Sequence, residues 1–111
     1  MSNSPRDLLR HIRDELQFLV REQAELSETQ FQHDEKAKRA FVRSLEIIGE
    51  AAKNFPPDYR EEHPELPWKP MTRMRDKLIH HYFGVDYPVV WDTVSSDIPP
   101  LLKQVEELLE G

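Results

Sequence analysis

The sequence contains no cysteine and no long run of apolar residues. Without cysteine there is no disulfide framework, no thiol nucleophile and no zinc site built on thiolates, a composition that suits a reducing cytosol. No apolar stretch approaches the roughly 20 residues of a membrane helix, and the first ten residues contain no apolar signal core. These absences predict a soluble, cytoplasmic protein without a membrane partner. Its 111 residues fit one domain, predicted over 1–111.

Positive charge is also in the minority, because 15 basic residues face 21 acidic ones and the formal net charge is -6. This balance argues against a general nucleic-acid binder, whose nonspecific affinity comes mainly from Lys and Arg on phosphates. The basic residues are nevertheless grouped, which permits a locally basic cleft. The two clusters are Lys36, Lys38, Arg39 and Arg43, and Lys69, Arg73, Arg75 and Lys77.

Two amphipathic helices are predicted in the first half of the chain. Ser4 provides an N-cap signal, and apolar residues then recur at helical spacing over about 5–24. The polar residues 25–33 predict a connection, and Asp34 can cap a second helix that continues to about Asn54, where two prolines stop it. The residues predicted to face inward are Leu9, Ile12, Leu16, Leu19, Phe41, Leu45, Ile48, Ala52 and Phe55.

The second half predicts two further helical segments and no strand. Residues 58–67 are charged and proline-rich, which indicates a loop with at most one helical turn. A third helix is predicted from about 67 to 81–83, with Gly84 as its C-terminal cap. A fourth pattern over 86–109 must kink or break at the double proline 99–100, which gives two nearly collinear segments. The class is all-α, an antiparallel bundle of four to five helices. The predicted inward-facing residues are Met71, Met74, Leu78, Ile79, Val90, Trp91, Val94, Ile98, Leu101, Leu102, Val105, Leu108 and Leu109.

Arg75, His80 and Tyr82 lie within eight residues of one another, in the segment RDKLIHHY. Arginine supplies a permanent charge and a fork of donors that suits a phosphate, and histidine, with an unperturbed pKa of about 6.5, exchanges a proton near neutrality. Together they could cleave RNA without metal, the histidine moving a proton at the ribose 2′-hydroxyl or the leaving oxygen. The simpler alternative is a surface arginine, a histidine at the edge of the core and a tyrosine at the rim of the bundle.

A regular helix does not aim both residues at one phosphate. With about 100° per residue, His80 would lie about 140° around the helix from Arg75, whereas Tyr82 would return to within about 20° of it. Either the helix distorts before Gly84, or the site is composite, with motifs from two subunits facing each other across a twofold axis.

Four segments together resemble one family over nearly the whole chain. They are LEIIGEAAKNF at 45–55, HPELPW at 63–68, MRDKLIHHYFGVD at 74–86 and VWDTVSSDIPPL at 90–101. These segments are similar to those of the HepT-like toxins of the HEPN superfamily, which implies a homodimer of helical bundles whose motifs meet at the dimer cleft. The implied activity is that of a metal-independent endoribonuclease toxin, without cofactor, in a type VII toxin–antitoxin pair.

The resemblance also implies a protein partner and a role for each motif residue. The partner would be a small MNT-type nucleotidyltransferase antitoxin that transfers AMP to the toxin, adding bulk and negative charge that block an RNA phosphate. Arg75 and His80 would be catalytic, Tyr82 would receive AMP, and Asp76 and His81 would support the motif. Many related sequences have Asn directly after the arginine. Asp76 keeps a hydrogen-bond acceptor there but adds a negative charge beside Arg75.

Other charged and aromatic residues have simpler interpretations. The cluster from Lys36 to Arg43 predicts a solvated face or else an RNA or partner surface, and Lys77 is a further candidate for such a contact. Glu46 and Glu50 share a helix face and predict a polar contact, with a motif arginine as one candidate partner, or else paired carboxylates for acid–base work. Trp68 and Trp91 are predicted as core anchors.

The remaining histidines, His11, His33 and His63, lie in separate segments without an HExxH or Cys/His pattern, so no metal site is predicted. Two rival functions remain open at this point. One is a noncatalytic subunit that presents a substrate or nucleotide to a small nucleotidyltransferase, and the other is a plain helical dimerisation domain.

Overall fold

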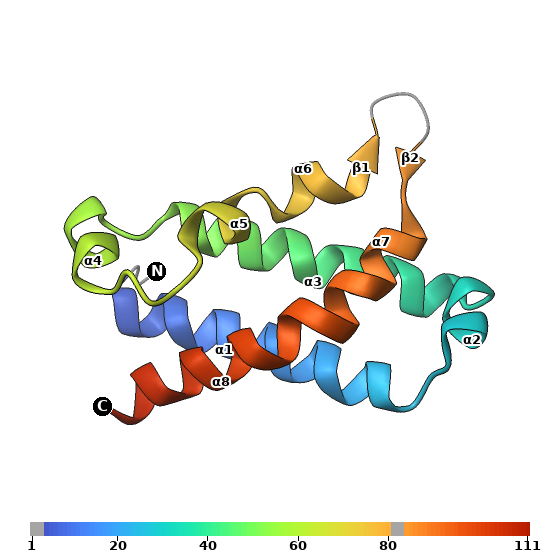
Figure 1. The fold of residues 1–111 in the computed structure, drawn as a ribbon, viewed down its shortest axis with the longest axis horizontal. Coiled ribbons are helices and arrows are strands. Elements are labelled where there is room, and N and C mark those ends of the chain that lie inside the picture. Colours follow the sequence, from blue (N-terminus) through green and yellow to red (C-terminus); the bar gives the residue numbers. More distant parts are fainter. Residues whose placement is uncertain (1–3, 81–83) are drawn as a thin grey trace.

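The computed structural model describes residues 4–80 and 84–111, and it has the predicted all-α class apart from one two-residue pair of strands (Figure 1). The elements in chain order are α1 (Pro5–Ala24), α2 (Glu28–Gln32), α3 (Glu35–Lys53), α4 (Pro57–Glu62), α5 (Trp68–Thr72), α6 (Met74–Leu78), β1 (Ile79–His80), β2 (Gly84–Val85), α7 (Tyr87–Asp92), the π-helical turn η1 (Thr93–Asp97) and α8 (Ile98–Glu110).

The predicted bounds of the two long helices in the first half of the chain are confirmed. Each helix begins directly after a residue whose side chain caps it. Ser4 Oγ accepts a hydrogen bond from the Asp7 backbone N–H at 3.2 Å and starts α1. Asp34 Oδ1 accepts from the Ala37 N–H at 3.0 Å and starts α3. Each cap satisfies an N–H that the first turn of a helix leaves without a partner.

The prediction of a plain connection at 25–33 is wrong, because the short helix α2 lies within it. Ser27 and Gln30 form a capping box, each side chain accepting from the backbone of the other. The helix turns Phe31 into the core, where its ring centroid lies 4.8 Å from that of Phe41 and 5.2 Å from that of Trp91. This aromatic packing stabilises a helix too short to form alone.

The third helix was predicted as one piece as far as 81–83, and this prediction is also wrong. The chain breaks at Arg73 into α5 and α6, and α6 ends at Leu78. Beyond it, β1 pairs antiparallel with β2, Ile79 opposite Val85 and His80 opposite Gly84. Gly84, with φ of 75°, therefore belongs to the returning strand and is not a helix cap.

The position of Asp86 explains why the helix stops there. Its carboxylate caps α7 by accepting from the Val89 N–H at 3.2 Å, and its own N–H donates to the Leu78 carbonyl at 2.8 Å. The carbonyl oxygen of Leu78, the last residue of α6, is therefore hydrogen-bonded to the returning chain, and the backbone continues as a strand. The segment 58–67 was predicted as a loop with at most one helical turn. The structure has the six-residue helix α4 there, which begins at Pro57 and is longer than one turn.

The fourth pattern is broken near the double proline, as predicted, but the break precedes it. The N–H of Ile98 donates to the carbonyl of Thr93, five residues back, so η1 is one turn of π-helix. Pro99 and Pro100 then occupy the first turn of α8, where a backbone N–H is not required. Figure 1 shows α7, η1 and α8 as one nearly continuous rod.

The rods alternate in direction, so the bundle is antiparallel (Figure 1). Helix α3 runs back along α1, the α5–α6 segment runs along α3, and the α7–α8 rod returns across α1. The start of α1 and the end of α8 meet, and the Arg6 guanidinium donates to the Leu109 carbonyl at 2.7 Å. We call α1, α2, α3 and the α7–α8 rod the body, and the described residues 68–80 and 84–85 the motif arm.

The buried core confirms most of the predicted inward-facing residues. All nine residues named in the first half of the chain, from Leu9 to Phe55, are buried, as are Met71, Met74 and Leu78 of the motif arm. In the rod, Leu102 and Leu108 are only partly buried and differ from the prediction. Trp91 is a core anchor, whereas Trp68 is half-buried and donates its indole N–H to the His63 carbonyl at 2.8 Å.

The motif arm lies directly against α3 at Gly49. A Cβ placed on Gly49 would lie 3.3 Å from the Met71 carbonyl oxygen, which is tighter than ordinary van der Waals contact. The absence of a side chain therefore lets the backbone of α5 approach α3. This close approach brings the next residues of the arm, on α6, within reach of polar side chains on α3.

Candidate active site

Arg75 projects from α6 toward α3, where it meets Glu46. Its Nε lies 3.4 Å from Glu46 Oε2, and the side chains are 55% and 30% exposed. The predicted contact between a carboxylate of α3 and a motif arginine is therefore present. Glu50, the other member of the predicted pair, instead faces Lys53 at 3.9 Å, so Glu46 and Glu50 do not act together.

The contact with Glu46 leaves much of the Arg75 guanidinium available. An arginine has five N–H groups, and the hydrogen bond to Glu46 uses the one on Nε. The four N–H groups on the terminal nitrogens form the fork that matches two phosphate oxygens. Because the side chain is more than half exposed, an incoming anion can reach that fork from solvent.

His80 leaves α6 behind and lies in β1, opposite Gly84. Of the two alternatives raised by the helical geometry, distortion of the helix before Gly84 is therefore present in the structure. The angle of about 140° that a continuous helix would impose between Arg75 and His80 no longer applies. The predictions for His81 and Tyr82 lie outside the described residues.

The neighbours of Arg75 on α6 are exposed and carry opposite charges. Asp76 is exposed, so its carboxylate contributes negative charge next to the candidate phosphate clamp. Lys77 is also exposed, and its Nζ lies 3.6 Å from Asp97 Oδ2 on η1. Both partners of this ion pair are more than half exposed, so water weakens their attraction.

The basic cluster at the start of α3 divides into two kinds of residue. Lys36, Arg39 and Arg43 are exposed and remain candidates for an RNA or partner surface. Lys38 is half-buried, with its Nζ 3.3 Å from both the Gln32 carbonyl and Glu35 Oε1 and 4.4 Å from the centre of the Tyr87 ring. Its ammonium group therefore contributes to packing within the body.

His11, His33 and His63 lie apart from one another in the structure. His33 Nδ1 lies 2.9 Å from the Thr29 carbonyl, and His63 Nδ1 lies 3.4 Å from Glu65 Oε2, while His11 is exposed on α1. Within residues 4–80 and 84–111, no group of three or more His, Asp and Glu side chains is arranged to hold a metal ion. No helix in this part of the chain is long and apolar enough to span a membrane.

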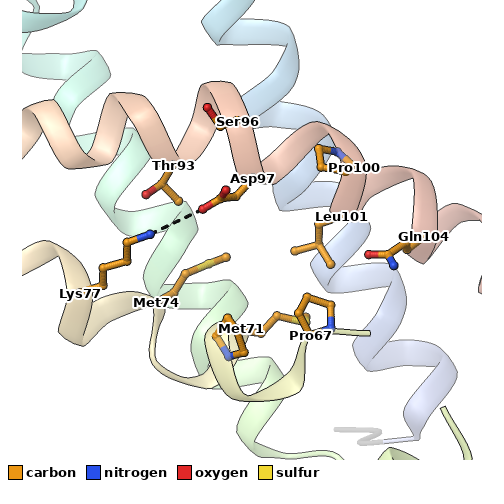
Figure 2. A pocket seen from close by; sticks show the side chains of 11 residues that line it. Pro67, Met71, Met74, Lys77, Thr93, Ser96, Asp97, Pro100, Leu101 and Gln104 are labelled. Atoms are coloured by element: carbon orange, nitrogen blue, oxygen red, sulfur yellow. Dashed lines mark ion pairs between the residues drawn. The ribbon is translucent and has the colours of Figure 1, made fainter. Parts of the chain in front are cut away.

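A groove of about 340 Å³ separates the motif arm from the α7–α8 rod (Figure 2). Met71, Met74 and Leu101 form its buried floor. At one end the side chains of Lys77 and Asp97 point toward each other across the opening. Sequence analysis did not identify this groove, because its two walls come from separate segments of the chain, 67–77 and 93–104.

Tyr59 is a titratable group whose environment is perturbed, and it lies away from Arg75. Partial burial raises the pKa of its phenol above the ordinary value of 10.0, the carboxylates of Glu65 and Glu62 add to the effect, and Arg6 opposes it. The ring stacks on Phe55 at 5.3 Å and contacts Trp68 edge-on at 6.2 Å. This cluster joins the end of α3 to the start of the motif arm.

Comparison with known proteins places the chain in a family. The family described as ribonuclease HepT-like matches residues 9–108, which is most of the sequence. The chain therefore belongs to the HepT-like ribonuclease family, as its segments indicated. No solved structure was found to match it.

Three relatives illustrate the similarity. A protein of Caldanaerobacter subterraneus subsp. tengcongensis, named as a candidate RNase, is 51% identical over 107 residues, 96% of each chain. A protein of Thermococcus cleftensis named "Probable ribonuclease HepT" is 47% identical and covers 97% of this chain and 98% of its own. A candidate RNase of Methanocaldococcus jannaschii is 42% identical over 94% of this chain and 83% of its own.

Proposed function

We propose that this protein is an endoribonuclease that cleaves RNA without a metal ion, with Arg75 and His80 as its catalytic residues. The exposed guanidinium of Arg75, attached to Glu46 through Nε, carries the proposal, because its terminal N–H groups remain available for a phosphate. Membership of a family described as ribonucleases supports the choice of RNA as substrate.

The proposed reaction is an internal transfer at phosphorus. The ribose 2′-oxygen attacks the adjacent phosphorus, and the bond from phosphorus to the 5′-oxygen of the next nucleotide breaks. One group removes the proton of the 2′-hydroxyl and another protonates the departing oxygen, which leaves a cyclic phosphate and a free 5′-hydroxyl. Arg75 would stabilise the charge that builds on the phosphorane oxygens, and His80 would perform one proton transfer.

Two proton transfers require two groups, whereas one chain contributes a single His80. A second copy of the chain across a twofold axis would provide the other imidazole. Such a homodimer also gives a small protein a cleft wide enough for an RNA strand. We therefore include a homodimer in the proposal, with one Arg75 and one His80 from each subunit.

The direct test is cleavage of total cellular RNA by tag-free protein in EDTA, beside His80→Ala and Arg75→Ala proteins prepared identically. The proposal expects cutting by the parent and none above background by either variant, with circular dichroism and sedimentation unchanged. Equal cutting by all three proteins would show that other residues, or a contaminant, perform the reaction. A parent that leaves RNA intact would favour the noncatalytic alternative.

We further propose that the protein is the toxin of a type VII pair. Its partner would be an MNT-type nucleotidyltransferase antitoxin that transfers AMP to Tyr82. Intact-mass analysis after incubation with the partner and ATP tests this idea. A mass increase of one or more adenylyl groups in the parent, absent from Tyr82→Phe, is expected. An equal increase in both proteins would place the modification on another residue.

A second candidate function is a noncatalytic subunit that binds RNA or a nucleotide for its partner enzyme. The observation in its favour is the pair of carboxylates close to Arg75. Glu46 contacts the guanidinium, and Asp76 is its neighbour in sequence, so negative charge competes with a phosphate. This alternative predicts RNA or nucleotide binding that depends on Arg75, without cleavage by the isolated chain.

A further inference from the structure

The groove between the motif arm and the α7–α8 rod has an apolar floor and polar ends (Figure 2). Its floor consists of two methionines and a leucine, Met71, Met74 and Leu101, which are 1%, 7% and 3% exposed. Proline side chains from both walls, among them Pro70 and Pro100, form the rim. Flat apolar surfaces of this kind, with the adaptable thioether of methionine, suit the face of an aromatic ring.

The polar groups are placed at the two ends of the groove. At one end Asp97 offers carboxylate oxygens and Lys77 an ammonium group. At the other, Gln104 donates through Nε2 to the Glu65 carbonyl at 3.0 Å, which leaves its side-chain oxygen as an acceptor. A planar group with apolar faces and hydrogen-bonding edges matches this arrangement. At about 340 Å³ the groove is at the small end of ligand sites, large enough for a single ring system.

The charges around the groove favour a nucleic-acid strand over an apolar protein side chain. Lys69, Arg73 and Lys77 are all exposed on the motif arm, and Lys77 also lines the groove. Exposed cations beside an apolar slot form the arrangement by which proteins hold single-stranded RNA, with phosphates on the cations and a base in the slot. The Lys77–Asp97 ion pair is exposed on both sides, so Lys77 can exchange the carboxylate for a phosphate at little cost.

The groove and Arg75 share helix α6. Met74 and Lys77 line the groove, whereas Arg75 turns toward Glu46 on α3. A helix of five residues is only about 7.5 Å long, so both features lie within a few nucleotides of each other on a bound strand. One RNA molecule can therefore place a phosphate at Arg75 and a neighbouring base in the groove.

We propose that this groove binds one base of the RNA strand, adjacent to the phosphate held by Arg75. The proposal rests on the ribonuclease function proposed above and adds a contact that would help position the strand. Because this contact takes no part in breaking the phosphodiester bond, it contributes to RNA affinity even when no bond is cut.

The test uses a matched pair of prolines in the first turn of α8. Pro100 lines the groove and Pro99 is not among the groove residues, although both are exposed. Pro100→Trp should fill the groove, and Pro99→Trp adds the same ring outside it. Both changes are made in a His80→Ala protein, so that no RNA is cut during the measurement. Pro70→Trp, from the opposite rim, replaces Pro100→Trp if that variant does not fold.

Affinities are measured by fluorescence anisotropy with short single-stranded RNAs in which one base at a time is removed. The His80→Ala protein and its Pro99→Trp variant should lose affinity about tenfold when the base at one position is missing, a typical contribution of one stacked base. Pro100→Trp should bind intact RNA about tenfold more weakly and be insensitive to removal of that base.

Three results would overturn the groove assignment. The first is that the Pro100→Trp and Pro99→Trp variants bind every RNA equally. The second is that affinity falls by the same factor whichever base is removed. The third is a change of sedimentation mass in Pro100→Trp alone, which would identify the groove as a contact between copies. Cleavage by the parent chain is recorded separately. If the parent cuts RNA but Pro100→Trp does not change the effect of base removal, the ribonuclease proposal holds and the groove proposal fails. If the effect of base removal depends on Pro100→Trp but the parent does not cut RNA, the groove still binds a base and the ribonuclease proposal fails.

Discussion

The body and the motif arm differ in how they are built. The body is built mainly from α1 and α3, of 20 and 19 residues, and the long α7–α8 rod, with the short α2 beside them, and their apolar side chains meet in the core. The motif arm consists of two five-residue helices and a two-residue strand pair, and four exposed cations lie along it. The body therefore supplies stability, whereas the arm supplies charge and hydrogen-bonding groups that are free to meet a ligand.

The arm is nevertheless attached to the body, and three of its contacts show how. Its backbone approaches Gly49 on α3, Arg75 pairs with Glu46, and Lys77 pairs with Asp97. The first contact is close packing, which tolerates little change, and the other two are exposed ion pairs, which contribute little to stability. Substitutions should therefore separate the two regions, with stability changing in one and RNA cleavage in the other.

The largest expected effect is on the stability of the body. Phe41 is fully buried against Phe31, so Phe41→Ala should lower the free energy of unfolding by about 3–5 kcal/mol. Urea unfolding followed by circular dichroism measures the change, and cleavage per folded molecule should stay near that of the parent. A loss below about 1 kcal/mol would mean that the aromatic cluster does not hold α2 and α3 together.

The arm should show the opposite behaviour at Arg75. Arg75→Ala should reduce RNA cleavage by about 10²–10³, the usual effect of removing one group that stabilises transition-state charge. Because Arg75 is exposed, unfolding should change by less than about 0.5 kcal/mol. Arg75→Lys is the matched control, and it should recover only part of the rate, since lysine lacks the planar fork. Full activity in the lysine variant would argue for a simple point charge.

A moderate loss of stability is expected from Gly49→Ala, at the junction between the body and the arm. Alanine favours a helix by about 0.5–1 kcal/mol over glycine, but overpacking costs about 1–3 kcal/mol. The added Cβ would lie 3.3 Å from the Met71 carbonyl oxygen, a backbone atom that also accepts from the Arg73 N–H. We expect a net loss of about 1 kcal/mol in urea unfolding, and a gain would show that the arm moves away easily.

A smaller effect is expected at Asp76. Asp76→Asn removes a negative charge next to Arg75 while keeping a hydrogen-bond acceptor, so RNA should bind about two- to fivefold more tightly at low salt, in line with a weak exposed interaction. The gain should shrink as the Debye length falls with added salt. Anisotropy at several salt concentrations measures it, and a gain that is independent of salt would require a different cause.

The smallest effect concerns the aromatic joint between α3 and the arm. The folded state raises the pKa of Tyr59 above its ordinary 10.0, chiefly by burial. The neutral phenol thus stabilises the fold fully below pH 10, and this contribution is lost as pH rises through the folded pKa. Tyr59→Phe should unfold with less dependence on pH above about 10 than the parent. Identical pH dependence would mean that the phenol is not protected in the folded protein.

The success of the sequence predictions follows the same division. In the body, the bounds of α1 and α3 and the burial of Ile12, Leu45 and Ile48 are as predicted, because caps and a 3.6-residue period act over one or two turns. In the arm, the helix predicted as far as 81–83 ends at Leu78. That end depends on a hydrogen bond from Asp86, which no local pattern around Leu78 encodes.

For the candidate site, too, the sequence predicted some features and missed others. The sequence indicated Arg75 as a phosphate clamp and a carboxylate of α3 as a candidate partner, and the structure pairs Arg75 with Glu46. Sequence analysis missed Phe31 as a core residue, although Ser27 and Gln30 carry the pattern of a capping box. It also missed the groove. Asp97 and Gln104 were not singled out because a polar residue on a helix usually faces solvent.

By itself, the sequence determined the all-α class, the positions of the long helices, the family and the residues of the motif. These properties depend on residue types and on spacings of a few positions, so a linear pattern contains them. Only the tertiary structure decided where the motif helix ends, that Glu46 meets Arg75 across 29 positions, and that a groove opens beside them. These features arise when distant segments pack together, and the free energy of that packing outweighs the local preference for helix.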